Sequence, residues 1–509
     1  MKTKIIQYCR RRDGASLSGF DSTRGLGHNS CTKPNPPRAN RRMTKPDPDP
    51  NSALIDHADA AIAPIVVADV VCLGCGCMCD DIEVVVDRNR DQEAIIATRN
   101  ACDLGVNWFQ HEHVRNQGLL ATIEGVSSSL DAGVERSAQI LSTARRPLVL
   151  GLEGLTIEAQ RSAIDLADAI RGFVVTRSRP GIDVVHRAIQ RVGIVGCTLG
   201  EVRHRADVIV YWRCDPVVTH PRHGERYGAN SVGRFIPRGR ADRRVTVVDA
   251  EPKETAAQAD DFVKLSNEHE YETLVILRAL VRGVPIDRGR AERQAGVDLQ
   301  VLERLVDTFK SARYGALIWD ESKYIKDCDS LTIEALLALV RDLNEGARFV
   351  AVELGGSANR AGANAVSTWR SGYPGAVDFA SGAPRYLPEV ADPAALIESR
   401  EVDAILMFQN LAWIGELKTM RDSAAAIPTI VVAPAHEPLE FSPSVSIATA
   451  SLGLNNRGTV MRVDGATLAL NPPLVSDRPH AAKIIEDIQK RFAAERSRKM
   501  SDQMTNRTK

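Results

Sequence analysis

Eight short runs of apolar residues recur along the chain, and most are followed by a segment with helical spacing. The runs span residues 147–151, 173–176, 206–212, 244–249, 315–319, 349–354, 404–408 and 429–433. Because Val and Ile follow one another without alternating polar residues, they predict strands buried on both faces, as in a parallel sheet. Residues 156–172 predict a helix that begins after Thr156 and stops at Gly172. The pattern therefore predicts an α/β fold with two doubly wound parallel-sheet domains.

Pattern and composition divide the 509 residues into six expected parts. Residues 1–60 are basic and rich in Pro, which predicts a disordered tail, and translation could begin at either Met1 or Met43. In residues 445–470 the apolar side chains no longer recur at helical spacing, which favours β structure near the end of the chain. The other expected parts are a cysteine domain (61–120), two α/β domains (121–310 and 311–440), a β-rich closing segment (441–490) and a frayed polar tail (491–509).

Five of the ten cysteines gather in one short stretch, at positions 72, 75, 77, 79 and 102. Thiolates this dense are soft metal ligands or disulfide partners. The spacing of Cys72, Cys75 and Cys79, with the more distant Cys102, can place four sulfurs around one 4Fe–4S cluster, which leaves Cys77 as a spare thiol. A structural zinc site, or a remnant that binds no metal, are the alternatives. A disulfide framework is disfavoured, because nothing in the sequence indicates secretion.

The charge balance excludes several classes of function. Lys plus Arg equals Asp plus Glu at 65 each, so bulk charge gives no case for binding nucleic acid or an acidic membrane surface. No apolar run approaches the roughly 20 residues that cross a bilayer. The remaining cysteines are scattered, which is typical of a reducing compartment, and we expect a cytoplasmic protein.

Three polar or glycine-rich segments are candidate sites. The loop 214–228 holds His220, Arg222 and His223 directly after an expected strand, where Arg and His suit phosphate or carboxylate groups; a salt-bridged surface loop is the alternative. Residues 355–388 combine glycines with aromatic residues but hold no phosphate-binding fingerprint, so a packed loop between domains is equally open. Residues 454–470 favour an ordinary β-hairpin.

Four blocks, in order along the chain, resemble a known family. They are CLGCGCMCDDIEV with NACDLG, TLGEVRHRADVIVYWRCDPVVTHPRHGERY, TWRSGYPGAVDFASGAPRYLP, and RGTVMRVDGATLAL. The chain is similar to the B subunit of formylmethanofuran dehydrogenase, in the molybdopterin oxidoreductase superfamily. The resemblance implies a 4Fe–4S cluster on Cys72, Cys75, Cys79 and Cys102. It also implies a molybdopterin or tungstopterin between the α/β domains, near His220, Arg222, His223, Gly372 and Tyr373.

The resemblance has consequences for partners as well. The superfamily's closing pterin-binding barrel does not fit in this chain, and in this family it resembles a separate polypeptide. An obligate complex with A, C and D subunits is therefore implied, together with a formyl carrier that is methanofuran-like or tetrahydromethanopterin.

One departure from the family pattern decides the expected function. Active members place a cysteine or selenocysteine on the metal, whereas the corresponding residues 177–193 hold neither, and Arg179 lies nearest that position. A guanidinium stays protonated and has no lone pair to give a metal. Ser178 and Asp183 are weak substitutes.

We therefore expect a non-redox scaffold within a formyltransferase/hydrolase complex in tetrahydromethanopterin-linked one-carbon metabolism. The alternative is an active tungsten or molybdenum oxidoreductase chain that interconverts formate or CO2 and the formyl carrier. A free-standing metal-binding or redox-sensing protein is a third class.

Overall fold

The computed structural model describes residues 63–88, 93–114, 119–176, 183–324, 329–356, 358–409, 426–434 and 442–507. The chain divides into two compact units, Met1–Ala60 and Ala61–Lys509, and all structure below belongs to the second. The expected tail 1–60 therefore lies outside the described residues, as does Arg179 with Ser178. No helix in the described ranges is both long and apolar enough to cross a membrane.

The described chain begins with a small antiparallel sheet that carries the cysteines. It consists of β1 (Ile65–Val70), β2 (Ile82–Asp87) and β3 (Ala94–Arg99), and α1 (Asp103–Val114) follows it. Four of the cysteines lie in the loop between β1 and β2, and Cys102 lies directly before α1. Alternate residues of β2, namely Ile82, Val84 and Val86, are buried, as expected for a strand with one face on a core.

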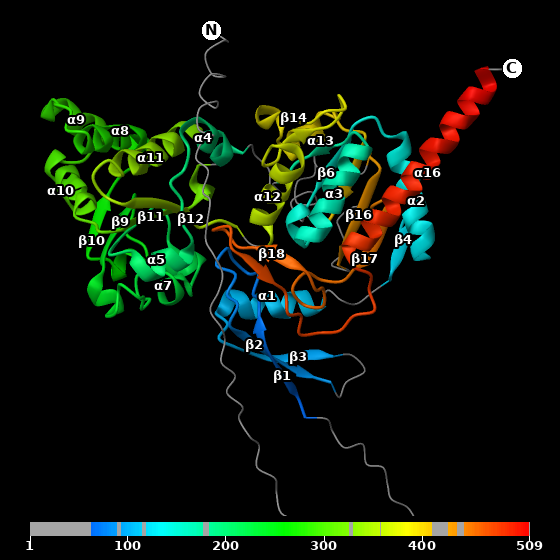
Figure 1. The fold of residues 1–509 in the computed structure, drawn as a ribbon, viewed down its shortest axis with the longest axis horizontal. Helices are drawn as coiled ribbons and strands as arrows, with labels where there is room; N and C mark the ends of the chain where they lie inside the picture. Colours follow the sequence, from blue (N-terminus) through cyan, green and yellow to red (C-terminus); the bar gives the residue numbers. More distant parts are fainter. Residues whose placement is uncertain are drawn as a thin grey trace, which may run out of the picture. The chain divides into compact units, whose positions relative to one another are not determined.

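A five-stranded parallel sheet follows, with the strand order β10-β9-β8-β11-β12 (Figure 1). Its strands are β8 (Val208–Trp212), β9 (Arg244–Asp249), β10 (Asp261–Lys264), β11 (Gly315–Trp319) and β12 (Phe349–Glu353). One face packs against α4 (Val184–Val192), α8 (Glu270–Val281), α9 (Arg288–Ala295), α10 (Leu299–Lys310) and α11 (Ser330–Leu343). The other face packs against α5 (Leu199–Arg205) and the cysteine loop. Every residue of β8 and β11 is buried, which is why these strands read as continuous apolar runs.

The second large sheet has nine strands in the order β14-β13-β7-β6-β15-β16-β17-β4-β5. Its parallel part consists of β7 (Phe173–Val174), β6 (Pro147–Leu150), β15 (Ala404–Met407), β16 (Thr429–Pro434) and β17 (Val445–Thr449). Antiparallel strands extend it, β13 (Val377–Asp378) and β14 (Arg385–Tyr386) at one edge, β4 (Ala121–Ile123) and β5 (Val126–Ser128) at the other. Its helices are α2 (Leu130–Thr143), α3 (Ile157–Ala169), α12 (Arg360–Ser371) and α16 (Ala481–Arg507) on one face, and α13 (Pro393–Glu398) on the other.

The predicted strands and helices appear close to their expected positions, but the sheets do not follow the expected division of the chain. The nine-stranded sheet takes strands from 121–310, from 311–440 and from the closing segment, and the five-stranded sheet takes strands from both of the first two ranges. The difference arises because β6 pairs with β15, more than 250 residues later, and a local apolar pattern carries no information about that partner.

The end of the chain also differs from expectation. A hairpin of β18 (Thr459–Met461) and β19 (Thr467–Ala469) lies within 454–470, as predicted. Residues 491–507, however, continue α16 instead of forming a frayed tail. Ile484, Ile488 and Phe492 are buried at i, i+4 spacing on α16, and Arg491 pairs with acidic residues of α2, so packing holds the start of this stretch in helical form.

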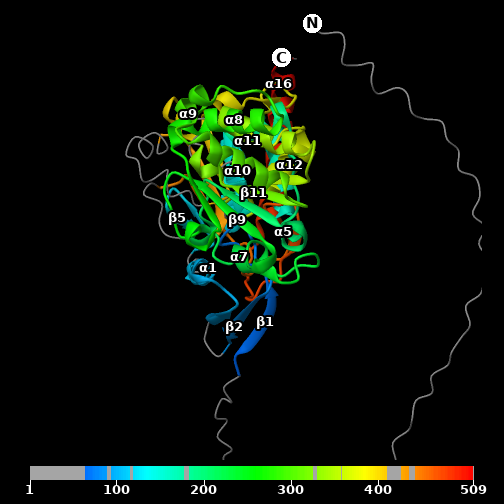
Figure 2. The same cartoon turned by 90° about the vertical axis from the view of Figure 1, so that its left-hand side faces the viewer.

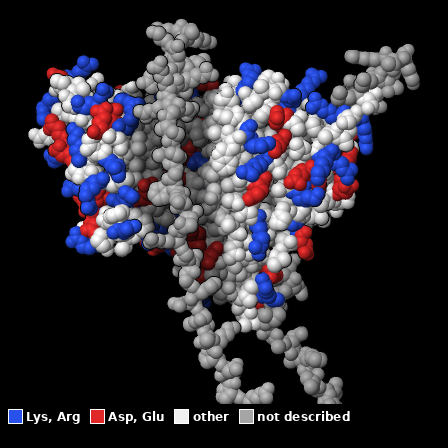
Figure 3. Space-filling view, in the orientation of Figure 1, with Lys and Arg blue, Asp and Glu red and all other residues white. Residues whose placement is uncertain are grey.

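Strands β1 and β2 lie below the five-stranded sheet in the view of Figure 2, in agreement with the core that this sheet shares with the cysteine loop. The face drawn in Figure 3 carries Lys and Arg interspersed with Asp and Glu, as the balanced composition predicts.

Candidate functional site

The loop between β1 and β2 folds the expected cluster ligands toward one another. The amide of Cys72 donates to the carbonyl of Cys79 at 2.8 Å, and the amide of Met78 donates to the carbonyl of Cys75 at 3.2 Å. All five thiols of this region are free of disulfides. Cys75, Cys79 and Cys102 would all raise the pKa of the Cys72 thiol further if they were ionised, so these three cysteines lie within electrostatic reach of Cys72.

Burial dominates the acidity of Cys72 and Cys79. It raises the pKa of Cys72 far above the ordinary value, and it raises the pKa of Cys79 to about 12 against the opposing charges of Arg226 and Arg222. A hydrogen bond with Cys77 instead lowers the pKa of Cys75, against the effect of burial. A buried thiol with a raised pKa is neutral unless a cation replaces the proton, as a bound metal does. Two buried and two half-buried thiols in this region are a donor set of the kind that binds an iron–sulfur cluster.

No group of three or more His, Cys, Asp or Glu side chains in the described ranges is arranged to hold a single metal ion.

Gly76 lets this loop approach the end of β12. A Cβ atom built on Gly76 would lie 2.0 Å from the carbonyl oxygen of Gly355, so no side chain fits there. The amide of Ala358 also donates to the carbonyl of Leu73 at 3.1 Å. The cysteine loop thus rests on the glycine-rich segment that the sequence marked as a candidate site.

Arg222 and its neighbour Arg226 hold the acidic residues that follow Cys79. The guanidinium of Arg222 donates to both carboxylate oxygens of Asp81, at 2.7 and 2.8 Å, and to Glu225 at 2.6 Å. Arg226 pairs with Asp80 and Asp81. Arg222 therefore anchors the cysteine loop, and it does not line the large cavity described below.

His220 and His223 are both buried near the cysteine loop. The Nδ1 atom of His223 lies 4.0 Å from the sulfur of Cys77, and the ring meets Tyr211 edge-on. Burial lowers the pKa of His223 to about 3, with a smaller contribution from His220, and burial also lowers the pKa of His220. Both rings are therefore neutral near pH 7, and Cys77, the expected spare thiol, contacts one of them.

The pKa of His223 predicts acid sensitivity. Its folded-state value of about 3 is below the ordinary 6.5, so its contribution to stability is complete above pH 6.5 and is lost as the pH falls below it. We expect the free energy of unfolding to fall by about 1.4 kcal/mol per pH unit from 6.5 toward about 5. Urea unfolding at several pH values would measure this slope. His223→Gln, which cannot titrate, should flatten it, and an equal slope in that variant would contradict the prediction.

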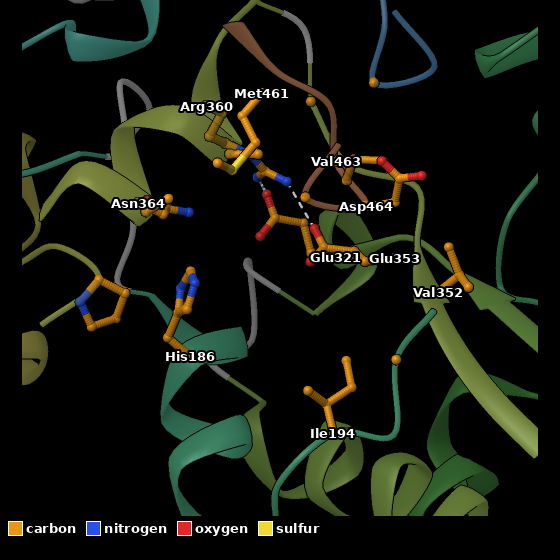
Figure 4. A pocket seen from close by; sticks show the side chains of 18 of the residues that line it. His186, Ile194, Glu321, Val352, Glu353, Arg360, Asn364, Met461, Val463 and Asp464 are labelled. Carbon is orange, nitrogen blue, oxygen red and sulfur yellow. Dashed lines mark hydrogen bonds and ion pairs between the residues drawn. The ribbon is translucent and has the colours of Figure 1, made fainter. Parts of the chain in front are cut away.

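A cavity of about 630 Å³ lies beside the cysteine loop, between the ends of β12, α4, α5, α12 and the β18–β19 hairpin (Figure 4). Gly76 and Met78 of the cysteine loop contribute to its wall, as do Gly355 and Gly356. Ligands of open parallel sheets bind at the carboxyl ends of the strands, and this volume is typical of small-molecule sites. The cavity is thus the candidate binding site of the molecule.

The charged residues that line the cavity are mostly acidic. The carboxylates are Asp183, Glu201, Glu321, Glu353 and Asp464. Arg360 pairs with Glu321, and with Glu353 at 2.8 Å, and Figure 4 shows both carboxylates facing it. Asp183 accepts from His186 at 2.5 Å, and Asp464 pairs with Arg462 at 2.8 Å. A phosphate group would meet more negative than positive charge from the described lining residues, so this part of the wall suits a neutral or cationic ligand better than a phosphorylated one.

Gly372 and Tyr373 lie just beyond the cavity wall, at the end of α12. Gly372 ends the helix with φ of 85°, a left-handed conformation that favours glycine. Tyr373 stacks on Tyr386 with ring centroids 5.2 Å apart, and Pro374 lines the cavity. Of the five expected cofactor-binding residues, none lines the cavity itself.

Sequence reasoning missed the residues that do line it. Glu321, Glu353 and Arg360 follow β11 and β12, where a strand-end rule could have found them, but no motif marks them. Asp183, noted as a weak metal ligand, caps α4 by accepting from the amide of His186. Cys197, noted only as a scattered thiol, also lines the cavity.

No family model matches the chain, but individual proteins do. It is 31% identical over 411 residues to the B subunit of tungsten-containing formylmethanofuran dehydrogenase 2 from Methanococcus maripaludis, covering 80% of this chain and 93% of that protein. The corresponding protein from Methanocaldococcus jannaschii is 30% identical, with the same coverage. The chain belongs to the family of formylmethanofuran dehydrogenase B subunits.

A more distant relative and two solved structures are also similar to this chain. The B subunit of the formyltransferase/hydrolase complex Fhc from Methylorubrum extorquens is 29% identical over 299 residues, 58% of this chain and 75% of that protein. The FhcABCD complex from this organism, solved with methylofuran, matches with a TM-score of 0.60 at 23% identity, covering 74% of this chain and 99% of the other. Acetylene hydratase from Pelobacter acetylenicus matches with a TM-score of 0.58 at 10% identity, over 84% and 70%. At these identities the structural matches support the shared fold alone.

Proposed function

We propose that this chain works in a complex with A, C and D subunits that handles formyl groups in tetrahydromethanopterin-linked one-carbon metabolism. We further propose that the chain itself does no redox chemistry and acts as a scaffold within a formyltransferase/hydrolase complex. The relative from Methylorubrum extorquens is a subunit of a formyltransferase/hydrolase complex, which supports the proposal that this chain works in such a complex.

The observation that carries the second part is the composition of residues 177–193. The stretch offers Arg179, Pro180 and Gly181 where active relatives place a sulfur or selenium donor. An arginine side chain has no lone pair for a metal at any physiological pH. Without that donor the metal loses the protein ligand on which the family's redox chemistry depends.

The charge of the cavity supports the same proposal. A pterin cofactor carries at least one phosphate. The described part of the wall presents five carboxylates, and Arg360 is already paired with two of them. This part of the wall would bind a phosphorylated cofactor poorly, since it offers more negative than positive charge. The described lining residues therefore do not fit a metallopterin.

The thiols of the cysteine loop support a different group. We propose that Cys72, Cys75, Cys79 and Cys102 hold a 4Fe–4S cluster, which supplies one-electron transfer when bound. In a scaffold the cluster would act structurally, because it joins the β1–β2 loop to the start of α1. Metal binding of this kind contributes directly to folding free energy.

The cysteines favour a second function. The four thiols of Cys72, Cys75, Cys79 and Cys102, with a further thiol at the cavity, Cys197, suit an active tungsten or molybdenum oxidoreductase. Such an enzyme would interconvert formate or CO2 and the formyl carrier. The pKa of Cys197 does not separate the two functions: burial, with the charges of Glu201 and Asp464, raises the pKa to about 12, as burial also does for Cys79. That thiol therefore stays protonated unless a metal displaces the proton.

Metal analysis of the native complex separates the two functions. We expect the complex, purified through a tag on another of its chains, to release formate from the formyl carrier and to contain less than about a tenth of an atom of tungsten or molybdenum per chain, since no protein donor holds either metal. It should not reduce viologen dyes. Stoichiometric tungsten or molybdenum that disappears in Cys197→Ser would establish the oxidoreductase instead.

A further inference from the structure

The end of α5 and the later loop 228–238 form an exposed surface of arginine and aromatic side chains. We call it the Arg–Phe patch; its members are Arg203, His204, Arg205, Val232, Arg234 and Phe235. Phe235 and Val232 are 52% and 57% exposed, a large apolar area for surface residues. The guanidinium groups of Arg205 and Arg234 lie 5.4 and 5.7 Å from the centre of the Phe235 ring.

Among the described residues, the arginines of the patch are not held in ion pairs. In the described part of the chain no ion pair joins Arg203, Arg205 or Arg234 to a carboxylate, whereas Arg238 and Arg240, at the end of this loop and directly after it, pair with Asp242 and Asp260. The patch is therefore a local positive surface on a chain with no net charge. Exposed Phe flanked by unpaired Arg has the composition that protein interfaces favour at their centres.

Hydrogen bonds fix the patch in place. The buried guanidinium of Arg243 donates to the carbonyls of Arg203 at 2.8 Å, Val202 at 3.2 Å and Ser231 at 2.9 Å, and thereby joins the end of α5 to the loop. The amide of Phe235 donates to the carbonyl of His204 at 3.0 Å. A surface held in this way loses little conformational freedom on binding, which favours affinity.

We propose that the Arg–Phe patch docks an acidic segment of another protein of the complex, with an apolar side chain of that segment packed on Phe235. Carboxylates would complement the three unpaired arginines, and burial of Phe235 and Val232 would supply the apolar contact. This inference rests on the proposed function, since it requires the complex. A nucleic acid is a poorer occupant, because the patch is short and its surroundings are not basic overall.

A pair of variants tests the patch in the assembled complex. In Phe235→Ala/Arg234→Glu we expect the affinity for one partner protein to fall about ten- to a hundredfold, and the remaining binding to lose its dependence on salt. The matched control is Tyr271→Ala/Arg304→Glu, which changes an exposed aromatic residue and an exposed arginine on α8 and α10. The control should bind as the unchanged chain does. Equal affinities in the two variants would overturn the proposal.

Crosslinking identifies the occupant. We would place the photo-crosslinking residue p-benzoylphenylalanine at Phe235, and at Tyr271 as a control, and sequence the crosslinked peptides from the intact complex. A peptide rich in Asp and Glu from another protein of the complex, seen at position 235 alone, supports the proposal. Crosslinks to a second copy of this chain, to nucleic acid, or to nothing in an intact complex overturn the patch alone. A chain that copurifies with no other protein overturns the proposed function as well.

Discussion

Anaerobically purified complex should contain about four iron and four sulfide per copy of this chain, and Cys79→Ser should lose most of both. The thiol of Cys79 is buried and its pKa is raised to about 12, so serine, a harder and still less acidic donor, cannot take its place on iron. The charge-transfer absorption of the cluster would follow the loss of iron. Because the loop is also held by the hydrogen bond between Cys72 and Cys79, the variant should retain its fold.

Cys77 provides the matched control for this experiment. It lies in the same loop and is also buried, but it contacts His223 and is the expected spare thiol. Cys77→Ala should therefore retain the iron and sulfide of the unchanged chain. An equal loss of iron and sulfide in the Cys79 and Cys77 variants would show that the ligand set is wrong. A native complex that contains no iron, and in which all five thiols react with a thiol reagent, would show that no cluster is bound.

Replacing Glu270 with leucine should lower the free energy of unfolding by about 3–5 kcal/mol. The carboxylate of Glu270 is buried and accepts from Arg213 at 2.8 Å, from the Trp212 indole at 2.7 Å and from the Tyr324 hydroxyl at 2.7 Å. Its loss leaves the guanidinium of Arg213, which is 2% exposed, with Asp249 as the nearest acid at 3.6 Å. A buried cation without its main counter-charge is strongly destabilising.

Urea unfolding monitored by tryptophan fluorescence would measure this effect, because Trp212 and Trp319 both lie in the core of the five-stranded sheet. The double variant Arg213→Met/Glu270→Leu should recover much of the loss, since it removes both charges together. Glu268→Leu, a change at a side chain that is 79% exposed, should alter stability by less than about 0.5 kcal/mol. A loss below about 1 kcal/mol in Glu270→Leu would contradict the account of this network.

The same network shows where sequence reasoning about sites fell short. Arg213 directly follows β8, where ligand-binding side chains are common, but its guanidinium donates to Glu270 and to the carbonyls of Leu265 and Ser266. The resemblance places Arg222 near a cofactor, and in the structure its guanidinium donates to both carboxylate oxygens of Asp81. Arginine suits an internal carboxylate as well as an external phosphate, so residue type and position after a strand could not distinguish the two.

By itself, the sequence determined where most strands and helices lie. Continuous Val and Ile runs mark β8, β9, β11 and β12 because both faces of these strands are buried, and Thr156 marks the start of α3 because its hydroxyl accepts from the amide of Ala159. These are local properties of a few neighbouring residues. The cysteine spacing likewise predicts a 4Fe–4S site on Cys72, Cys75, Cys79 and Cys102, three of which lie in the β1–β2 loop and one directly before α1.

Only the tertiary structure decided which strands share a sheet and which residues form the cavity. Strand β6 pairs with β15 across more than 250 residues, and Glu321, Glu353 and Arg360 meet at the cavity because β11 and β12 end there and α12 begins there. Contacts of this kind depend on how segments far apart in the chain pack against one another. Because the free energy of that packing comes from the whole fold, no short stretch of sequence predicts which segments will meet.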